Sequence, residues 1–160
     1  MNKEILRAIL ISAGVYGIEP DLVYGICQKE SGFVPEAVRY EDGYRYLFDP
    51  SRVRPRGCSL DTEIVMQKTS WGVMQVMGGV LRELGFTGWM TGIVGDIPAQ
   101  VDYGCRHLGR FIRRYGLPDA IAAYNAGSPR QNEAGVLVNQ EYVDAVLLYK
   151  SQAALQGLVA

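Results

Sequence analysis

The chain has 160 residues, 48% of them apolar and 21% charged, which suits one soluble globular domain with a sizeable core. Its formal net charge is −1, and this balance gives no reason to expect nucleic acid or an anionic membrane surface as a partner. No stretch approaches the ~20 apolar residues that span a membrane, so we expect no membrane span.

Cysteine and histidine usage argues against a disulfide framework and a metal site. Three cysteines cannot all pair, and Cys27 and Cys105 fall at apolar positions where buried free thiols are common. With His107 as the single histidine, we expect no metal and no cofactor. Glu4 and Arg7 interrupt the N-terminal apolar run, so we expect synthesis in a cytoplasm without a signal peptide.

Helical spacing of apolar residues dominates the chain. Prolines fall at expected first turns and glycines at expected ends, as at Pro20 and Gly32. We predict a mostly α fold of six or seven helices, forming a single domain over residues 1–160. The expected helices are 3–16, 20–31, 60–68, 70–84, 98–115, 118–124 and 140–154.

Residues 34–58 are the least regular part of the chain. They contain three prolines, three tyrosines and five arginines, and Asp42-Gly43 is a signal for a small hairpin. Long structured loops in compact domains are often functional. The plain alternative is a charged, solvated surface loop.

Glu30 lies at the end of the apolar face of the second expected helix. It follows Ile26 by four residues and Cys27 by three, which places it on or beside that face. Burial raises the pKa of a carboxylate, and a raised pKa suits a general acid near neutral pH. The alternative is a surface glutamate at a helix end, or one half of an ion pair.

Three segments carry a resemblance to a known family: residues 30–33 (Glu-Ser-Gly-Phe), 70–75 (Ser-Trp-Gly-Val-Met-Gln) and 122–127 (Ala-Ala-Tyr-Asn-Ala-Gly). In this order, each at an expected helix end, they resemble the motifs of the soluble, lysozyme-like lytic transglycosylases of glycoside hydrolase family 23. Residues 139–143 are similar to that family's N-Y-V element. Val73 replaces a more usual leucine, and Gln100 a usual asparagine.

The spacing of the first two motifs departs from many members of that family. Ser70 follows Glu30 by 40 positions (30 to 70), so residues 39–69 form an inserted loop region. The insertion, with Arg39-Tyr40-Glu41, is similar to forms encoded by bacteriophages. The resemblance therefore implies a phage or prophage enzyme that acts at the bacterial cell wall after release or delivery.

The resemblance implies that the substrate is peptidoglycan, cleaved between N-acetylmuramic acid (MurNAc) and N-acetylglucosamine (GlcNAc). Glu30 would act first as acid and then as base while the C6 hydroxyl of the sugar attacks, leaving a 1,6-anhydro end. The resemblance implies a supporting role for six further residues. Ser31 would lie near the cleft or fix the helix end, Met74 would pack on a sugar face, and Gln75 with the Met74 backbone would hold an acetamido group. Tyr124 and Asn125 would line the cleft, and Tyr142 would steady Glu30.

Two alternatives remain open on the same residues. A hydrolytic muramidase would need a base such as Glu41, Asp42 or Asp49 in the inserted loop. A non-catalytic wall-binding module of a phage tail or secretion apparatus would need no acid at all. For Tyr124 and Tyr142, ordinary core packing with a satisfied hydroxyl is the plain interpretation. We expect a monomer that binds glycan strands.

Overall fold

The first two helices begin and end where local sequence signals predict, in a computed structural model that describes residues 2–155 and 157. Helix α1 (Lys3–Tyr16) is capped by Asn2, whose side chain accepts a hydrogen bond from the backbone of Glu4 at 2.9 Å. Helix α2 (Pro20–Ser31) ends at Gly32, whose φ of +62° is the left-handed region that glycine adopts without strain. Glu30 therefore sits in the last turn of α2.

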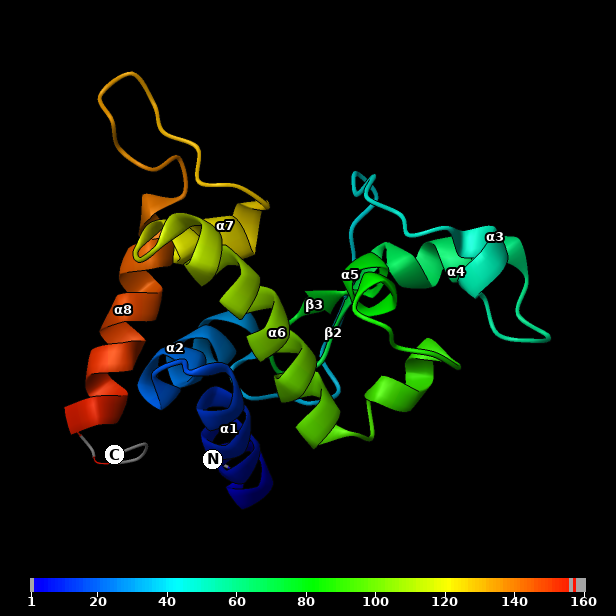
Figure 1. The fold of residues 1–160 in the computed structure, drawn as a ribbon, viewed down its shortest axis with the longest axis horizontal. Helices are drawn as coiled ribbons and strands as arrows, with labels where there is room; N and C mark the ends of the chain where they lie inside the picture. Colours follow the sequence, from blue (N-terminus) through cyan, green and yellow to red (C-terminus); the bar gives the residue numbers. More distant parts are fainter. Residues whose placement is uncertain (1, 156, 158–160) are drawn as a thin grey trace.

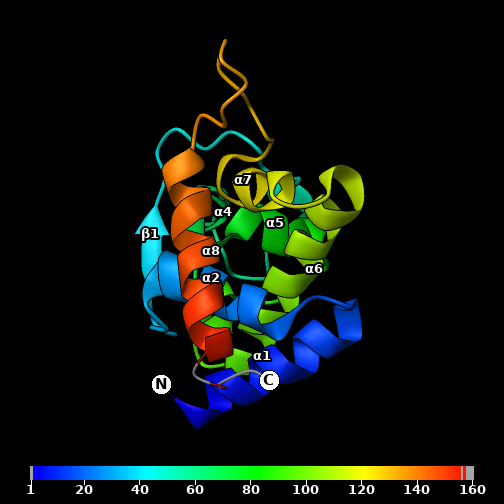
Figure 2. The ribbon, with the colours of Figure 1, turned by 90° about the vertical axis from the view of Figure 1, so that its left-hand side faces the viewer.

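The long helices form one lobe around α2. Helix α2 lies along α8 (Gln140–Leu155), while α6 (Ile97–Tyr115) contacts both α1 and α7 (Asp119–Ala126) (Figures 1 and 2). This arrangement buries the apolar stripes of the helices against one another, which is the main source of their stability. Fully buried side chains of this lobe include Ile5, Ile9, Leu22, Ile26, Leu108, Ile121 and Val146.

A small antiparallel sheet joins this lobe to the rest of the chain. Strand β1 (Val38–Tyr40) pairs with β2 (Thr69–Trp71), which pairs with β3 (Val76–Met77). The predicted hairpin at Asp42-Gly43 is wrong, because a turn forms there but β1 pairs with the distant β2. The sheet brings the start of the inserted region to the second motif.

The predicted helix from Ser70 to Leu84 is wrong in its first half. Residues 70–77 form β2, a tight turn and β3, and only Gly78–Glu83 is helical, as α5. The turn requires positive φ at Gly72 (+73°) and Gln75 (+49°). Trp71, Val73, Met74 and Val76 are buried whichever way they point from the chain. The apolar spacing of the stretch therefore resembled that of a helix.

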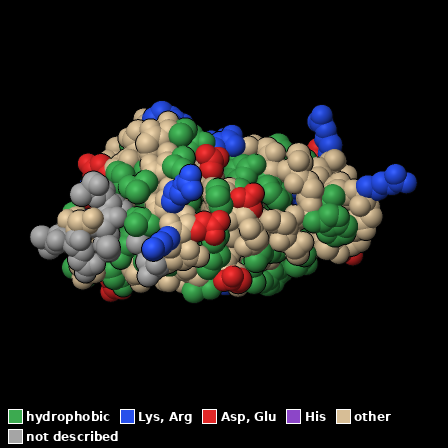
Figure 3. Space-filling view, turned by 90° about the horizontal axis from the view of Figure 1, so that it is seen from below, with side chains coloured by type: hydrophobic (Ala, Val, Ile, Leu, Met, Phe, Trp, Pro, Cys, Tyr) green, Lys and Arg blue, Asp and Glu red, His purple; other side chains and the backbone are tan. Residues whose placement is uncertain are grey.

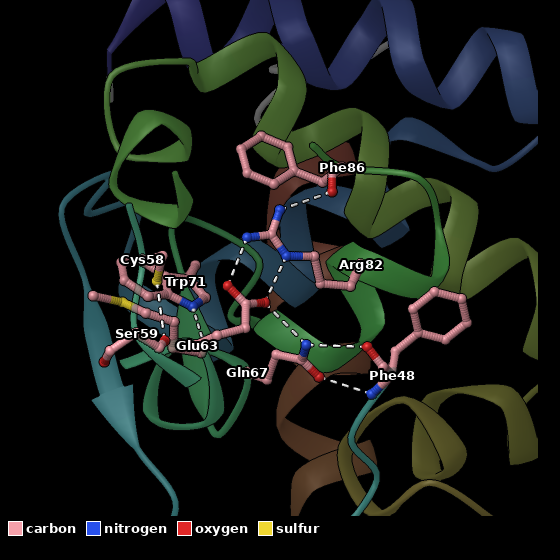
Figure 4. Close-up of polar contacts among 9 residues, drawn as sticks. Phe48, Cys58, Ser59, Glu63, Gln67, Trp71, Arg82 and Phe86 are labelled. Atoms are coloured by element: carbon pink, nitrogen blue, oxygen red, sulfur yellow. Dashed lines mark hydrogen bonds and ion pairs between the residues drawn. The ribbon is translucent and has the colours of Figure 1, made fainter. Parts of the chain in front are cut away.

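The second lobe consists of α3 (Pro50–Val53), α4 (Leu60–Gln67) and α5, at the right of Figure 1. Its interior holds an ion pair between Glu63 and Arg82, with N–O distances of 2.8 and 2.9 Å and both side chains 1% exposed (Figure 4). Arg82 also donates to the carbonyl of Phe86. The pair joins α4 to α5, and loss of either partner would leave a buried charge.

The inserted loop is attached to α4 through the buried amide of Gln67. Its oxygen accepts from the backbone N–H of Phe48 at 2.7 Å, and its nitrogen donates to the Phe48 carbonyl at 3.1 Å and to Glu63 at 2.9 Å (Figure 4). The Gln67 amide thus bonds both backbone groups of Phe48, as the backbone of a neighbouring β-strand would. This attachment places the aromatic segment 44–48 opposite α6.

The observed architecture confirms the predicted mostly α, lysozyme-like fold. Over the described residues it has eight α-helices, one more than the seven ranges predicted, because α3 forms a single turn in the inserted loop. A 3-10 helix (Met90–Ile93) interrupts the loop before α6. None of the helices described is long and apolar enough to cross a membrane. The face in Figure 3 carries interspersed acidic and basic side chains.

Candidate active site

Glu30 lies where two hollows of the surface meet. The larger hollow, of about 890 Å³, lies between the two lobes, and we call it the main cleft. The smaller, of about 510 Å³, lies beside the start of α8, and we call it the side hollow. Both are lined by Glu30, Arg39 and Asn125, so an extended ligand can pass Glu30 on both sides.

The surroundings of Glu30 favour its protonated form. Burial raises the pKa of the half-buried Glu30 carboxyl. The Tyr142 hydroxyl, which donates to Oε1 at 2.5 Å, and the charges of Arg39 and Lys29 act in the opposite direction and offset part of that rise. The result is a carboxyl group that can carry a proton and release it, as acid–base catalysis requires.

Two tyrosines near Glu30 are held as hydrogen-bond donors. Burial, followed by the charge of Glu30, raises the pKa of Tyr142 and of Tyr124 well above the ordinary value, so both hydroxyls keep their protons. Tyr142 donates to Glu30 from α8, and Tyr124 donates from α7 to the carbonyl of Met74 at 2.8 Å. Tyr142 is placed to steady the carboxylate, and the ring of Tyr124 lines the main cleft.

Ser31 fixes the end of α2 rather than lining either hollow. Its hydroxyl donates to the Val73 carbonyl at 2.9 Å and accepts from the Val34 backbone at 3.2 Å. These bonds connect the helix end to the turn between β2 and β3. Of the two roles expected for Ser31, the geometry supports the fixing of the helix end, which indirectly holds Glu30.

Gln75 lines the main cleft, but its amide is already engaged. Nε2 donates to the carbonyls of Ala37 at 3.0 Å and Gly72 at 2.9 Å, and Oε1 accepts from the Ser70 hydroxyl at 2.7 Å. An amide offers two donors and two acceptor sites, so one acceptor site on Oε1 is left for a ligand. Gln75 therefore braces the turn and offers a single contact.

The expectation that Met74 packs on a sugar face is wrong. Its side chain is fully buried and lies against α6, where a Cβ added to Gly104 would stand 2.2 Å from its sulfur. The apolar thioether fills the interface between the turn and the helix. Only the Met74 carbonyl faces the site, where it accepts from Tyr124.

Asn125 reaches the surface at the junction of the two hollows. Its Oδ1 accepts from Nδ2 of Asn139 at 3.0 Å, and the same nitrogen donates to the Ala122 carbonyl. Asn139 thereby orients the Asn125 amide. The sequence placed Asn139 in a motif but assigned it no role, since the two residues meet only when α7 and α8 pack together.

Comparison with known proteins gives one match. The family described as "Transglycosylase SLT domain" matches residues 7–142, a span that includes Glu30, Gln75, Tyr124 and Tyr142. The chain belongs to this family. Its members are lytic transglycosylases, so the protein is an enzyme that cleaves peptidoglycan. Among curated proteins and among solved structures, nothing matched.

The walls of this transglycosylase's main cleft come from the inserted loop and from α6. Tyr44, Tyr46 and Phe48 of the inserted loop line one wall, and α6 contributes His107, Phe111, Arg114 and Tyr115 to the other. The sequence assigned no role in a cleft to these α6 residues, because their position opposite the inserted loop depends on packing between distant segments. Burial lowers the pKa of His107 to about 4, so its ring is neutral at physiological pH.

The inserted loop contributes only some of its charged residues to the cleft. Arg39 and Glu41 line it and form an ion pair at 2.6 Å, whereas Arg45, Asp42 and Asp49 are not among the described lining residues. Within the described ranges, no group of three or more histidine, cysteine or acidic side chains is placed to hold a metal ion.

Proposed function

We propose that Glu30 performs both proton transfers of a lytic transglycosylase. Protonated Glu30 gives its proton to the GlcNAc O4 as the bond from MurNAc C1 to that oxygen breaks. The MurNAc C6 hydroxyl then bonds to C1, and ionised Glu30 takes the hydroxyl proton, leaving a 1,6-anhydro ring and consuming no water. The observation that carries this proposal is a half-buried carboxyl of raised pKa, held by Tyr142 in an open cleft.

The surrounding residues support that chemistry in stated ways. Tyr142 stabilises the ionised carboxylate between the two transfers. Asn125, oriented by Asn139, offers its amide nitrogen to a sugar acetamido group, which stabilises the developing charge at C1. Gln75 offers its remaining acceptor site. Ser31 keeps the end of α2, and with it Glu30, against the turn.

A hydrolytic muramidase is the second candidate, favoured by one observation. Glu41 lines the same cleft as Glu30, so it could activate a water. Its pairing with Arg39 favours a charge-balancing role instead. Mass spectrometry of digested peptidoglycan separates the two, because anhydro ends lack one water. We expect anhydro ends from the wild type and still from Glu41→Gln; reducing ends that vanish in Glu41→Gln would support the muramidase.

The assignment of the acid has a direct test. Glu30→Gln should abolish product formation while the protein still folds and binds peptidoglycan, and the exposed Glu36→Gln is the matched control. Product formation that survives in Glu30→Gln would refute the assignment. A wild type that binds peptidoglycan without any turnover would instead support a non-catalytic wall-binding module.

The inserted stretch Arg39-Tyr40-Glu41 supports a bacteriophage or prophage setting for the enzyme. In that setting it reaches the wall from the cytoplasm after release, or with a virion, and works as a monomer on glycan strands. Cytoplasmic expression should then leave cells intact until the membrane is permeabilised, and gel filtration should give the mass of one chain. Lysis before permeabilisation would contradict this route.

A further inference from the structure

A row of aromatic rings runs along the wall of the main cleft away from Glu30. It begins at Tyr124 and continues on α6 through His107, Phe111 and Tyr115, and we call these four residues the ring row. Neighbouring ring centres are 5.5, 4.7 and 6.1 Å apart. The three α6 residues share one helix face because they are spaced four apart. The row therefore offers a continuous apolar strip.

The one histidine of the ring row is neutral at physiological pH. His107 is the ring row's only basic member, and burial, assisted by the charge of Arg110, lowers its pKa to about 4. The imidazole is thus a neutral ring that packs edge-on against Phe111. Any charge offered to a ligand at this end of the cleft must come from another residue.

Arg114 supplies that charge, and among the residues that the structure describes it has no acidic partner. Among the other charged residues lining the cleft, Glu41 pairs with Arg39 at 2.6 Å, and Glu83 pairs with Arg110 at 2.9 Å. Arg114 forms no ion pair with any residue that the structure describes. Its guanidinium lies 5.1 Å from the centre of the Tyr115 ring, at the far end of the ring row.

We infer that this end of the cleft is a subsite for the peptide stem of the strand that the enzyme cleaves. The rings of the row cover the methyl groups and backbone of the stem, and Arg114 pairs with one of its carboxylates. This inference rests on the proposed function, because it takes the substrate strand to pass Glu30. In intact strands the lactyl carboxyl of each MurNAc is amide-linked to the stem and the sugars carry no charge, so only the stem offers a carboxylate to the guanidinium.

The test compares two soluble substrates prepared from the same strands, one with intact stems and one stripped of stems by an amidase and then amidated at the exposed lactyl carboxylates, so that its sugars carry no charge. Its readout is the ratio of kcat/KM on stem-bearing strands to that on stripped strands. Arg114→Gln should lower this ratio about twofold to fivefold, as expected for an exposed arginine–carboxylate pair. Phe111→Ala should lower it in the same direction.

Arg113→Gln is the matched control. Arg113 is the adjacent residue, is likewise exposed, and lies against Gly109 on another face of α6. It should leave the ratio unchanged. If Arg114→Gln lowers activity equally on both substrates, the ring row binds glycan and the stem assignment is wrong. If Arg114→Gln changes kcat/KM on neither substrate, the ring row is not a subsite.

A binding measurement separates this inference from the proposed chemistry. A synthetic stem peptide has no glycosidic bond, so its binding to the wild-type protein can be followed by calorimetry whatever Glu30 does. We expect binding that weakens with salt and that falls about twofold to fivefold in Arg114→Gln but not in Arg113→Gln. Equal binding by all three proteins would overturn the subsite, while absent turnover with normal peptide binding would overturn only the proposed function.

Discussion

Replacing Tyr142 with phenylalanine tests how the acid is tuned. The Tyr142 hydroxyl donates to Oε1 of Glu30 and offsets part of the rise in pKa that burial causes. Phenylalanine keeps the ring in its buried position on α8 but removes the donor. The ionised form of Glu30 loses more than the protonated form, so the pKa of Glu30 must rise.

The size of the effect follows from the kind of hydrogen bond that is lost. A bond to a charged acceptor contributes about 1.5–3 kcal/mol and one to a neutral acceptor about 0.5–1.5 kcal/mol. The difference, about 1–1.5 kcal/mol, corresponds to about one pH unit. In the proposed mechanism Glu30 must be protonated to begin the reaction, so activity declines as pH rises through its pKa. The descending limb of the kcat/KM profile should therefore move about one unit to higher pH.

The assay is the pH dependence of kcat/KM on soluble strands, measured between about pH 4 and 9. Tyr149→Phe, on the same helix and outside both hollows, is the control and should leave the profile in place. The plateau of Tyr142→Phe should also fall, because the carboxylate is less well held. A folded Tyr142→Phe protein whose descending limb stays fixed, or moves to lower pH, would refute this account of the site.

Three further predictions concern the stability of the fold and are tested with five variants. Burial raises the pKa of Glu30, so the folded state holds the Glu30 proton more tightly than the unfolded state, and stability falls as pH rises above the ordinary pKa of a glutamate. Glu30→Gln should therefore have a higher Tm than the wild type at pH 7, and the difference in Tm should close near pH 4. An equal difference at both pH values would contradict this. Gly78→Ala places a Cβ 2.1 Å from a backbone oxygen and should lower the free energy of unfolding in urea by about 1–3 kcal/mol. Gly14→Ala has open space around it in α1 and should raise that free energy by about 0.5–1 kcal/mol. The reverse order of stability would be inconsistent with the packing. Glu63→Gln should lower the free energy of unfolding by about 3–5 kcal/mol, because it leaves the buried Arg82 charge without a partner. Glu63→Leu combined with Arg82→Met should lower it less. An equal loss in the double variant would show that the ion pair itself stabilises the fold.

Local signals were sufficient for the elements that bear Glu30. Proline and glycine set the bounds of α2, and apolar spacing placed Glu30 beside its buried face. The same reasoning failed at residues 70–77, where Trp71, Val73, Met74 and Val76 are all buried although they do not share one helix face. Met74 shows the consequence, because its motif position suggested a sugar contact and its packing against α6 prevents one.

The sequence by itself determined the helical fold class and the ordered motifs and singled out Glu30 as the proposed acid, because each depends on residues close together in the chain. Only the tertiary structure decided which side chains face the cleft. The Gln67 amide holds the aromatic loop in place, Asn139 orients Asn125, and one face of α6 carries the ring row. The first two relations join residues 19 and 14 positions apart, beyond the reach of helical periodicity, and the exposure of that α6 face to the cleft depends on the loop opposite it.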